Sequence, residues 1–176
     1  SFNGLPKGNV DLNELRMLIG NCVDTEKLFE GTLFENISLG RDAATFENVK
    51  WAAENVGLGE FVKQQPLGFD TQLEPEGRRL PSSIIKKLIL ARSIAHKPKL
   101  LLLKDALQYL VQPERDEIIN FLTSKKHGWT LIAVSSDINL AKKCDKVVLI
   151  SDGAVEHEGT YDQLKDLDKL KKITHA

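Results

Sequence analysis

The sequence predicts an α/β fold with a parallel sheet, preceded by a mainly helical segment. In the second half of the chain, helical patterns alternate with short apolar runs at residues 100–103 and 130–134. Strands that are covered on both faces, as in parallel sheets, read as continuous apolar runs. In the first half, capping signals recur at short intervals and mark several small helices.

In the first half, most elements are predicted from their caps. Thr32 with Glu35 forms a capping box that starts a helix ending at Gly40. Asp11 and Thr45 have the side chains that cap helices from residue 12 and over residues 46–56. The other predicted elements are a strand at 19–23 and a helix at 58–64.

In the second half, a polar loop at residues 68–83 leads into a helix at 84–96, which Ser82 or Ser83 can cap. Pro98 ends this helix. The remaining predictions are buried strands at 100–103 and 130–134, helices at 113–123 and 139–144, a strand hairpin at 147–150 and 154–158, and a last helix that Thr160 caps.

The composition excludes several classes of function. The 176 residues carry a net charge of −1, so no global field favours nucleic acid. The apolar runs are too short to span a bilayer. The two cysteines and four histidines show no metal-ligand spacing, and the histidines are predicted to be surface residues. No metal site is therefore predicted from them.

The residues that follow the two buried strands are the first candidates for a site, because parallel sheets bind ligands at the carboxyl ends of their strands. Residues 100–105 read Leu-Leu-Leu-Leu-Lys-Asp. A carboxylate at the end of such a strand is typical of an NTPase metal site, yet the first charged residue is Lys104. The second strand is followed by Ser135, Ser136 and Asp137.

An ordered set of motifs resembles the nucleotide-binding domain of exporter-type ABC transporters. Leu28-Phe29-Glu30-Gly31-Thr32 with Glu35-Asn36-Ile37 is similar to the pattern L-F-x-G-T-I-x-E-N-I. Further matches are Gly68-Phe69-Asp70-Thr71, Ala91-Arg92-Ser93-Ile94 with Pro98 and the leucine run, Cys144-Asp145-Lys146-Val147, Asp152-Gly153 and Glu158-Gly159-Thr160. The resemblance extends from Leu15 to Leu164 and implies a P-loop NTPase-like (ABC ATPase) sheet with an inserted helical subdomain.

The resemblance also implies a division of the chain. Residues 24–96 correspond to the helical subdomain and the signature-helix region, 97–160 to the α/β core, and 161–176 to a C-terminal helix and tail. The phosphate loop G-x-x-x-x-G-K-[ST] would lie upstream of Ser1, and no such run occurs in the sequence. We therefore expect the chain to lack the N-terminal part of the domain and to bind ATP poorly by itself.

The site residues that the resemblance implies are changed in type. Asp24 stands where the family has a metal-holding glutamine, and Ser82 and Ser83 replace the two glycines of the signature L-S-G-G-Q. Lys104 stands at the position of the family's metal-binding aspartate. The nucleotide-binding positions that the resemblance implies are therefore Asp24, Ser82, Ser83 and Lys104. Asp105 and Ser136 stand at the catalytic glutamate and the switch histidine.

These changes predict a degenerate site. Lys104 repels Mg²⁺, and it could instead contact phosphate as a point charge or form a solvated ion pair. Asp105 is one methylene shorter than glutamate, and Ser136 lacks the charge and reach of an imidazole. Ser82 and Ser83 could bind an anion or simply cap the helix. ATP and Mg²⁺ are cofactors of the family, and we expect little or no hydrolysis here.

Two functions are compatible with the sequence. In the first, the chain is the ATP-binding domain of an exporter on the cytoplasmic side of the cell membrane. The resemblance then implies contacts of Glu30 and Phe34 with the transmembrane domain, and of Glu76 and Gly77 with a second nucleotide-binding domain. The alternative is a non-enzymatic regulatory or interaction protein built on the same scaffold. A phosphate loop and membrane helices upstream would distinguish the first from the second.

Overall fold

The computed structural model describes residues 4, 6, 8, 10–23, 27–168 and 170 of the chain. It divides the chain into two compact units, each described by itself below. The first unit comprises Ser1–Leu110 and Lys125–Ala133, and the second comprises Val111–Ser124 and Val134–Ala176. Within the described ranges, no helix is long and apolar enough to cross a membrane.

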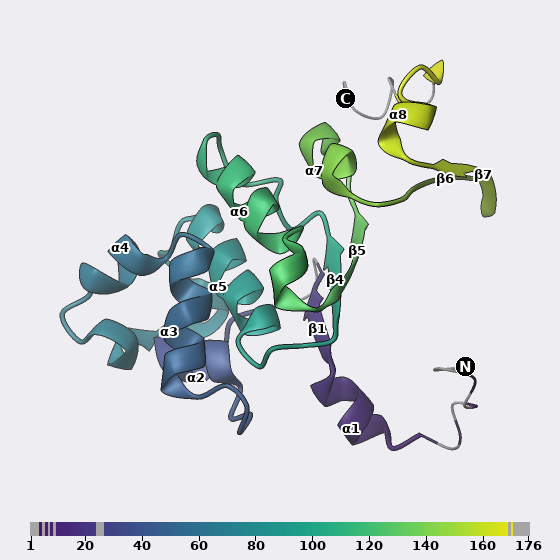
Figure 1. Ribbon diagram of the computed structural model, residues 1–176. Helices are drawn as coiled ribbons and strands as arrows, with labels where there is room; N and C mark the ends of the chain where they lie inside the picture. The colour runs from purple at the N-terminus through teal and green to yellow at the C-terminus, as the bar shows by residue number, and fades with distance from the viewer. Residues whose placement is uncertain are drawn as a thin grey trace. The chain divides into compact units, whose positions relative to one another are not determined.

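A three-stranded sheet lies at the centre of the first unit (Figure 1). Its strands are β1 (Ile19–Cys22), β4 (Leu100–Lys104) and β5 (Thr130–Val134), in the order β1-β4-β5. β1 and β4 are parallel, with Ile19 opposite Leu100 and Cys22 opposite Leu103. The α/β fold with a parallel sheet that the sequence predicts is therefore confirmed.

Helix α5 (Ser82–Ile94) packs against β1 and is the central helix of this unit. Its residues 87–94 are all buried, which agrees with a sequence that is apolar on most faces. The approach to β1 is so close that a side chain at Gly20 would overlap the backbone oxygen of Ser93. Gly20 is therefore required by the packing of the helix on the strand.

A group of short helices covers the other side of α5. Helix α2 (Leu33–Ser38) begins with the capping box predicted from Thr32 and Glu35, and Thr45 caps α3 (Phe46–Asn55) as expected. Both helices contact α5. The remaining elements are α1 (Leu12–Met17), the antiparallel strand pair β2 (Gly31–Thr32) and β3 (Gln72–Leu73), α4 (Gly59–Lys63), and the 3₁₀ helices η2 (Gly68–Asp70), η3 (Pro75–Gly77) and η4 (Lys125–His127).

The second unit has a small apolar core. Leu149, Leu164 and Leu170 are buried against one another, with Val147 and Tyr161 at the margin. Thr160 caps the last helix through a capping box with Gln163, as the sequence predicts. The elements of this unit are α6 (Glu114–Leu122), α7 (Ile138–Lys143), the antiparallel hairpin β6 (Val147–Ser151) and β7 (Ala154–Gly159), and α8 (Tyr161–Leu164).

The predicted burial of the strands is wrong in part. In β4, Leu101 and Leu103 are buried, but Leu100 and Leu102 are only partly covered. In β5 no residue is buried, and Ile132 and Val134 are 54% and 62% exposed. The side chains of β5 are exposed because, as far as the described residues extend, β5 is the last strand on its side of the sheet.

The predicted start of the long helix is also wrong. α5 begins at Ser82 rather than residue 84, with Pro81 at the N-cap position and no side-chain capping hydrogen bond. Ser82 and Ser83 therefore lie inside the first turn and do not cap the helix. Proline is well suited to this position, because its fixed φ favours a helix start and it has no N–H to leave unsatisfied.

Candidate functional site

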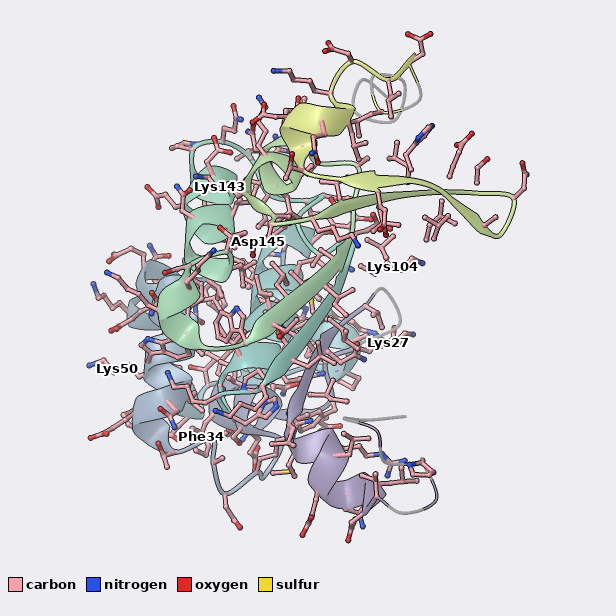
Figure 2. The ribbon with its side chains drawn as sticks, turned by 45° about the vertical axis from the view of Figure 1, so that its right-hand side comes forward. Lys27, Phe34, Lys50, Lys104, Lys143 and Asp145 are labelled. Atoms are coloured by element: carbon pink, nitrogen blue, oxygen red, sulfur yellow. The ribbon has the colours of Figure 1, made fainter. Side chains whose placement is uncertain are left out.

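The carboxyl ends of β1 and β4 meet at one edge of the sheet. Cys22 lies opposite Leu103, so the residues that follow these strands share this edge. Lys104 is the last residue of β4 and is exposed (Figure 2). Asp24, predicted for the same edge, lies outside the described residues. Lys104 thus lies at this edge, and its assignment as a nucleotide-binding position stays a prediction.

Asp105 follows directly and turns the chain away from the strand. Its φ of 50° lies in the left-handed region, which aspartate tolerates better than most residues. A hydrogen bond from the Gln108 N–H to the Asp105 carbonyl closes the turn at 3.4 Å, and the side chains of Ala106 and Leu107 are buried beneath it. The short carboxylate at the catalytic position is therefore held on a tight turn.

The residues at this edge do not fit a bound Mg²⁺. This ion requires carboxylate, phosphate or water oxygens, and an ammonium group at the strand end repels it. In the part of the chain that the structure describes, no three His, Cys, Asp or Glu side chains are grouped to hold a metal. We derive no catalytic step through Mg²⁺ at this edge.

The amino end of α5 presents backbone donors. The first turn of any α-helix leaves N–H groups without an intrahelical acceptor, and here Ile85 is already bonded to the carbonyl of Pro81 at 3.1 Å. The first turn contains no acidic residue. Ser82 is exposed and Ser83 partly covered, so each adds a side chain where the family has glycine. Such a helix end favours an anion electrostatically, but the side chains limit how closely one approaches.

Ser136 belongs to the second unit. It is exposed and immediately precedes Asp137, which caps α7 by accepting hydrogen bonds from the N–H groups of Asn139 and Leu140. Asp137 also forms an ion pair with Arg115 at 3.4 Å. The hydroxyl that stands for the switch histidine thus lies at the start of a well-capped helix.

A buried arginine connects the helical part of the first unit. Arg92 of α5 is 4% exposed, and its Nε donates to the Asn36 carbonyl at 2.7 Å. Its two terminal nitrogens donate to the Lys27 carbonyl at 2.9 Å and to Asn36 Oδ1 at 3.2 Å. The Asn36 amide donates in turn to the carbonyls of Phe29 and Thr32. One network therefore joins α5, α2 and the segment between β1 and β2.

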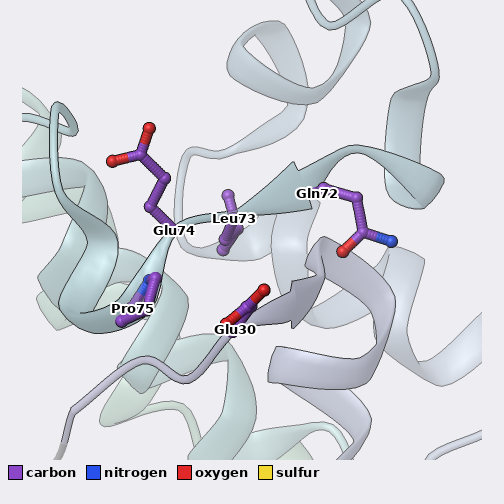
Figure 3. A pocket seen from close by; sticks show the side chains of 5 residues that line it. All are labelled: Glu30, Gln72, Leu73, Glu74 and Pro75. Atoms are coloured by element: carbon purple, nitrogen blue, oxygen red, sulfur yellow. The ribbon is translucent and has the colours of Figure 1, made fainter.

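The two residues predicted to contact a membrane domain lie just before β2 and in α2. Glu30 precedes β2 and lines a pocket with Gln72, Leu73, Glu74 and Pro75 (Figure 3). Phe34 is partly covered and stacks on Phe46, with ring centroids 6.2 Å apart. Phe46 is 56% exposed and also meets Phe69 edge-on at 5.5 Å. An exposed aromatic side chain such as Phe46, packed on two further rings, is compatible with an interaction surface.

Glu76 and Gly77 lie in η3. Glu76 has a φ of 59° and accepts a hydrogen bond from Lys27 Nζ at 2.6 Å, which lowers the pKa of its carboxyl group. Gly77 has a φ of 69°, and a Cβ there would lie 2.9 Å from Leu28 Cδ1. The loop is thus fixed to the Lys27–Leu28 segment, while Glu76 stays exposed at the surface.

Comparison with known proteins gives consistent results across the chain. A putative export ATP-binding/permease protein of Rickettsia bellii is 28% identical over 163 residues, which is 93% of this chain and 28% of that protein. An uncharacterized ABC transporter ATP-binding protein of Bacillus subtilis, YfiB, is 30% identical over 167 residues, or 95% of this chain and 29% of that protein. The chain is a homologue of ABC-type export ATP-binding proteins. No family model matches it.

The solved structure of a bacterial Atm1-family ABC exporter with ATP bound gives the same fold. The TM-score is 0.86 at 23% identity, over 97% of this chain and 30% of that one. The match confirms the ABC-type α/β architecture predicted from the motifs. The chain spans between 9% and 34% of the length of the first relatives that it matches.

The burial of three polar residues in the first unit was not predicted from the sequence. Asn36 and Arg92 were considered only as matching positions of the family motifs. However, a charged residue inside a helix that is apolar on all faces must find buried polar partners. His96 was predicted to be a surface residue, but it is 4% exposed. It is within 2.8 Å of Arg41 and 3.2 Å of the Ile19 carbonyl, and burial lowers its pKa to about 4. His96 is therefore a neutral residue of the core.

Proposed function

We propose that this chain is a nucleotide-binding domain of an exporter-type ABC transporter whose own nucleotide site hydrolyses ATP little or not at all. The assignment to the ABC export proteins rests on relatives that match nearly the whole chain. The loss of hydrolysis rests on one observation, the exposed Lys104 at the carboxyl end of β4. In this proposal, Lys104 occupies the position of the family's Mg²⁺ ligand but lacks the negative charge that would hold the ion.

Electrostatics support this reading of Lys104. In an active phosphoryl-transfer site, the metal neutralises the phosphates and is itself held by carboxylates. A lysine at the carboxylate position repels the metal and can at most meet a phosphate as a point charge. Asp105 adds a second defect, because a base that is displaced by about one ångström loses much of its rate advantage.

The retained role is mechanical. Arg92 connects the helix that begins at the signature position to Asn36 of α2 and to the backbone of Lys27. Movement at the amino end of α5 is therefore transmitted to the surface that carries Glu30 and Phe34. We propose that this surface docks on the transmembrane domain of the exporter, at the cytoplasmic face of the membrane.

The second partner is another nucleotide-binding domain, either a copy of this one or a related chain. Glu76 and Gly77 face it in this proposal. An exporter that pairs this domain with a competent one retains transport, because the competent half supplies hydrolysis. The substrate and the direction of transport are not part of the proposal.

The test is made in the full-length protein that contains this chain. We expect Asp105→Asn to leave the Mg²⁺-dependent ATPase rate unchanged, because this carboxylate has no catalytic role. We expect the triple variant Lys104→Asp, Asp105→Glu and Ser136→His to raise the rate, with Lys104→Ala as a control that removes the lysine without restoring the carboxylate. A loss of activity by orders of magnitude in Asp105→Asn would show that the site hydrolyses ATP.

A further inference from the structure

The side chain of Lys104 lies on the face of the sheet opposite to the one that α5 covers. A Cβ at Gly20, where α5 approaches β1, would lie 3.0 Å from Leu101 Cδ1, so Leu101 belongs to the covered face. Successive side chains of a strand point to opposite faces, and Leu103 is buried like Leu101. Lys104 therefore points to the other face, with Leu102, at the carboxyl end of β4 (Figure 2).

The charged side chains at the end of β4 suit a phosphate better than Mg²⁺. An ammonium group donates up to three hydrogen bonds to phosphate oxygens and has no lone pair for a metal. Asp105 is the only carboxylate within residues 100–113, and no group of side chains that could hold a metal is found in the described part of the chain. This edge therefore offers a cation where the resemblance implies a metal and its ligand.

We propose that this edge binds a nucleoside triphosphate without Mg²⁺, and that Lys104 Nζ supplies the positive charge that a metal supplies in an active site. The inference rests on the proposed function, which makes this chain a nucleotide-binding domain. A free triphosphate carries more negative charge than its Mg²⁺ complex, so an ammonium group attracts the free form more strongly. The event is binding alone, and no bond of the nucleotide is broken.

The strand fixes the base of the lysine side chain while its charged end can adjust. Lys104 follows Leu103, which pairs with Cys22 of β1, and the ammonium group lies at the end of a flexible four-carbon stem. The competing arrangement is an ion pair between Lys104 and a carboxylate of the chain such as Asp105, which would neutralise the ammonium group. The two arrangements differ in one measurable respect, because removal of the lysine weakens triphosphate binding only in the first.

The experiment measures ATP binding by calorimetry in the full-length protein that contains this chain, once with excess EDTA and once with Mg²⁺. We expect the dissociation constant of the wild-type site in EDTA to be no higher than in Mg²⁺. Lys104→Ala should raise the constant in EDTA by about tenfold, the order of effect of one charge pair near a protein surface. The variant also identifies the site, because any other nucleotide site in the protein keeps its affinity in Lys104→Ala.

Three further variants separate the charge of Lys104 from its other properties. Lys104→Arg keeps the charge and should keep the affinity in EDTA within about twofold. Lys104→Asp should reverse the preference, so that ATP binds at least about tenfold more tightly with Mg²⁺ than in EDTA. Lys99→Ala is the matched control, because Lys99 is an exposed lysine that immediately precedes the same strand, at its amino end. It should leave both constants unchanged.

Two results would overturn this inference: ATP binding that requires Mg²⁺ in the wild type, or equal affinities in EDTA for the wild type, Lys104→Ala and Lys99→Ala. Neither result decides the proposed function, which is tested by the ATPase rate of Asp105→Asn. A domain that binds ATP only with Mg²⁺ and hydrolyses little of it would contradict the inference and keep the proposed function. The absence of ATP binding under both conditions would overturn both.

Discussion

The carboxyl edge of β1 and β4 and the network around Arg92 lie in the same unit but differ in kind. At the edge, Lys104 and Asp105 stand where the resemblance predicts other residue types, and Lys104 is exposed. In the network, Arg92 and Asn36 are buried and joined to backbone carbonyls of two other segments. A substitution should therefore cost little stability at the exposed edge and much more in the buried network.

Burial explains this difference. A charged group in the interior is tolerated only when its donors are satisfied, so losing Arg92 leaves several carbonyls without partners. An exposed residue at a strand end has water as an alternative partner. Changes at Lys104 are therefore expected to have little effect on folding, and changes at Arg92 a large one. The four predictions that follow test this contrast, from the largest expected effect to the smallest.

Arg92→Leu should be the most destabilising change in the first unit. It removes three hydrogen bonds and leaves the buried Asn36 side chain without its Arg92 partner, which costs about 3–5 kcal/mol of unfolding free energy. Urea unfolding followed by circular dichroism measures the loss. Arg79→Leu is the matched control, because Arg79 is 86% exposed in its ion pair with Glu74 and should cost below about 1 kcal/mol. Equal losses of unfolding free energy in the two variants would contradict the contrast between buried and exposed positions.

Gly77→Ala should have the second largest effect. The alanine has to adopt a φ of 69° and also meets Leu28 Cδ1 at 2.9 Å, so we expect about 2–3 kcal/mol of destabilisation. Gly128 has the same φ of 69°, but a Cβ there meets nothing within 4 Å. Gly128→Ala therefore isolates the backbone cost, about 1 kcal/mol. If the two alanine variants unfold at the same urea concentration, the packing of η3 on Leu28 contributes nothing.

His96 makes stability depend on pH. Its pKa falls from 6.5 to about 4 on folding, so between these values the unfolded chain binds more protons than the folded chain. Stability should be full above pH 6.5 and fall as the pH is lowered towards 4. The urea midpoint at pH 7, 6 and 5 measures this loss, and His96→Gln should flatten the dependence between pH 7 and pH 5. An unchanged slope in the variant would assign the effect to other groups.

What could be predicted from the sequence was local. The capping box at Thr32 and the cap at Thr160 were predicted correctly because a cap and the residues that it contacts lie within three residues of each other. The partners of Arg92 lie 56 and 65 residues away, and no periodicity indicates which carbonyls it meets. The burial of β5 was predicted wrongly for the same reason, since an apolar run does not say how many neighbours its strand will have.

Lys104→Ala should be the least disruptive of the four changes. The side chain is exposed at the end of β4, so the unfolding free energy should change by no more than about 0.5 kcal/mol. Lys104→Asp tests the same point with the charge reversed, and it places a second carboxylate beside Asp105, which Mg²⁺ can then bridge. We expect Mg²⁺ to raise the thermal midpoint of Lys104→Asp and to leave that of Lys104→Ala unchanged. If Lys104→Ala were destabilised as much as Arg92→Leu, Lys104 would have a structural role. Its positive charge could then not be explained by a change in the chemistry of the site alone.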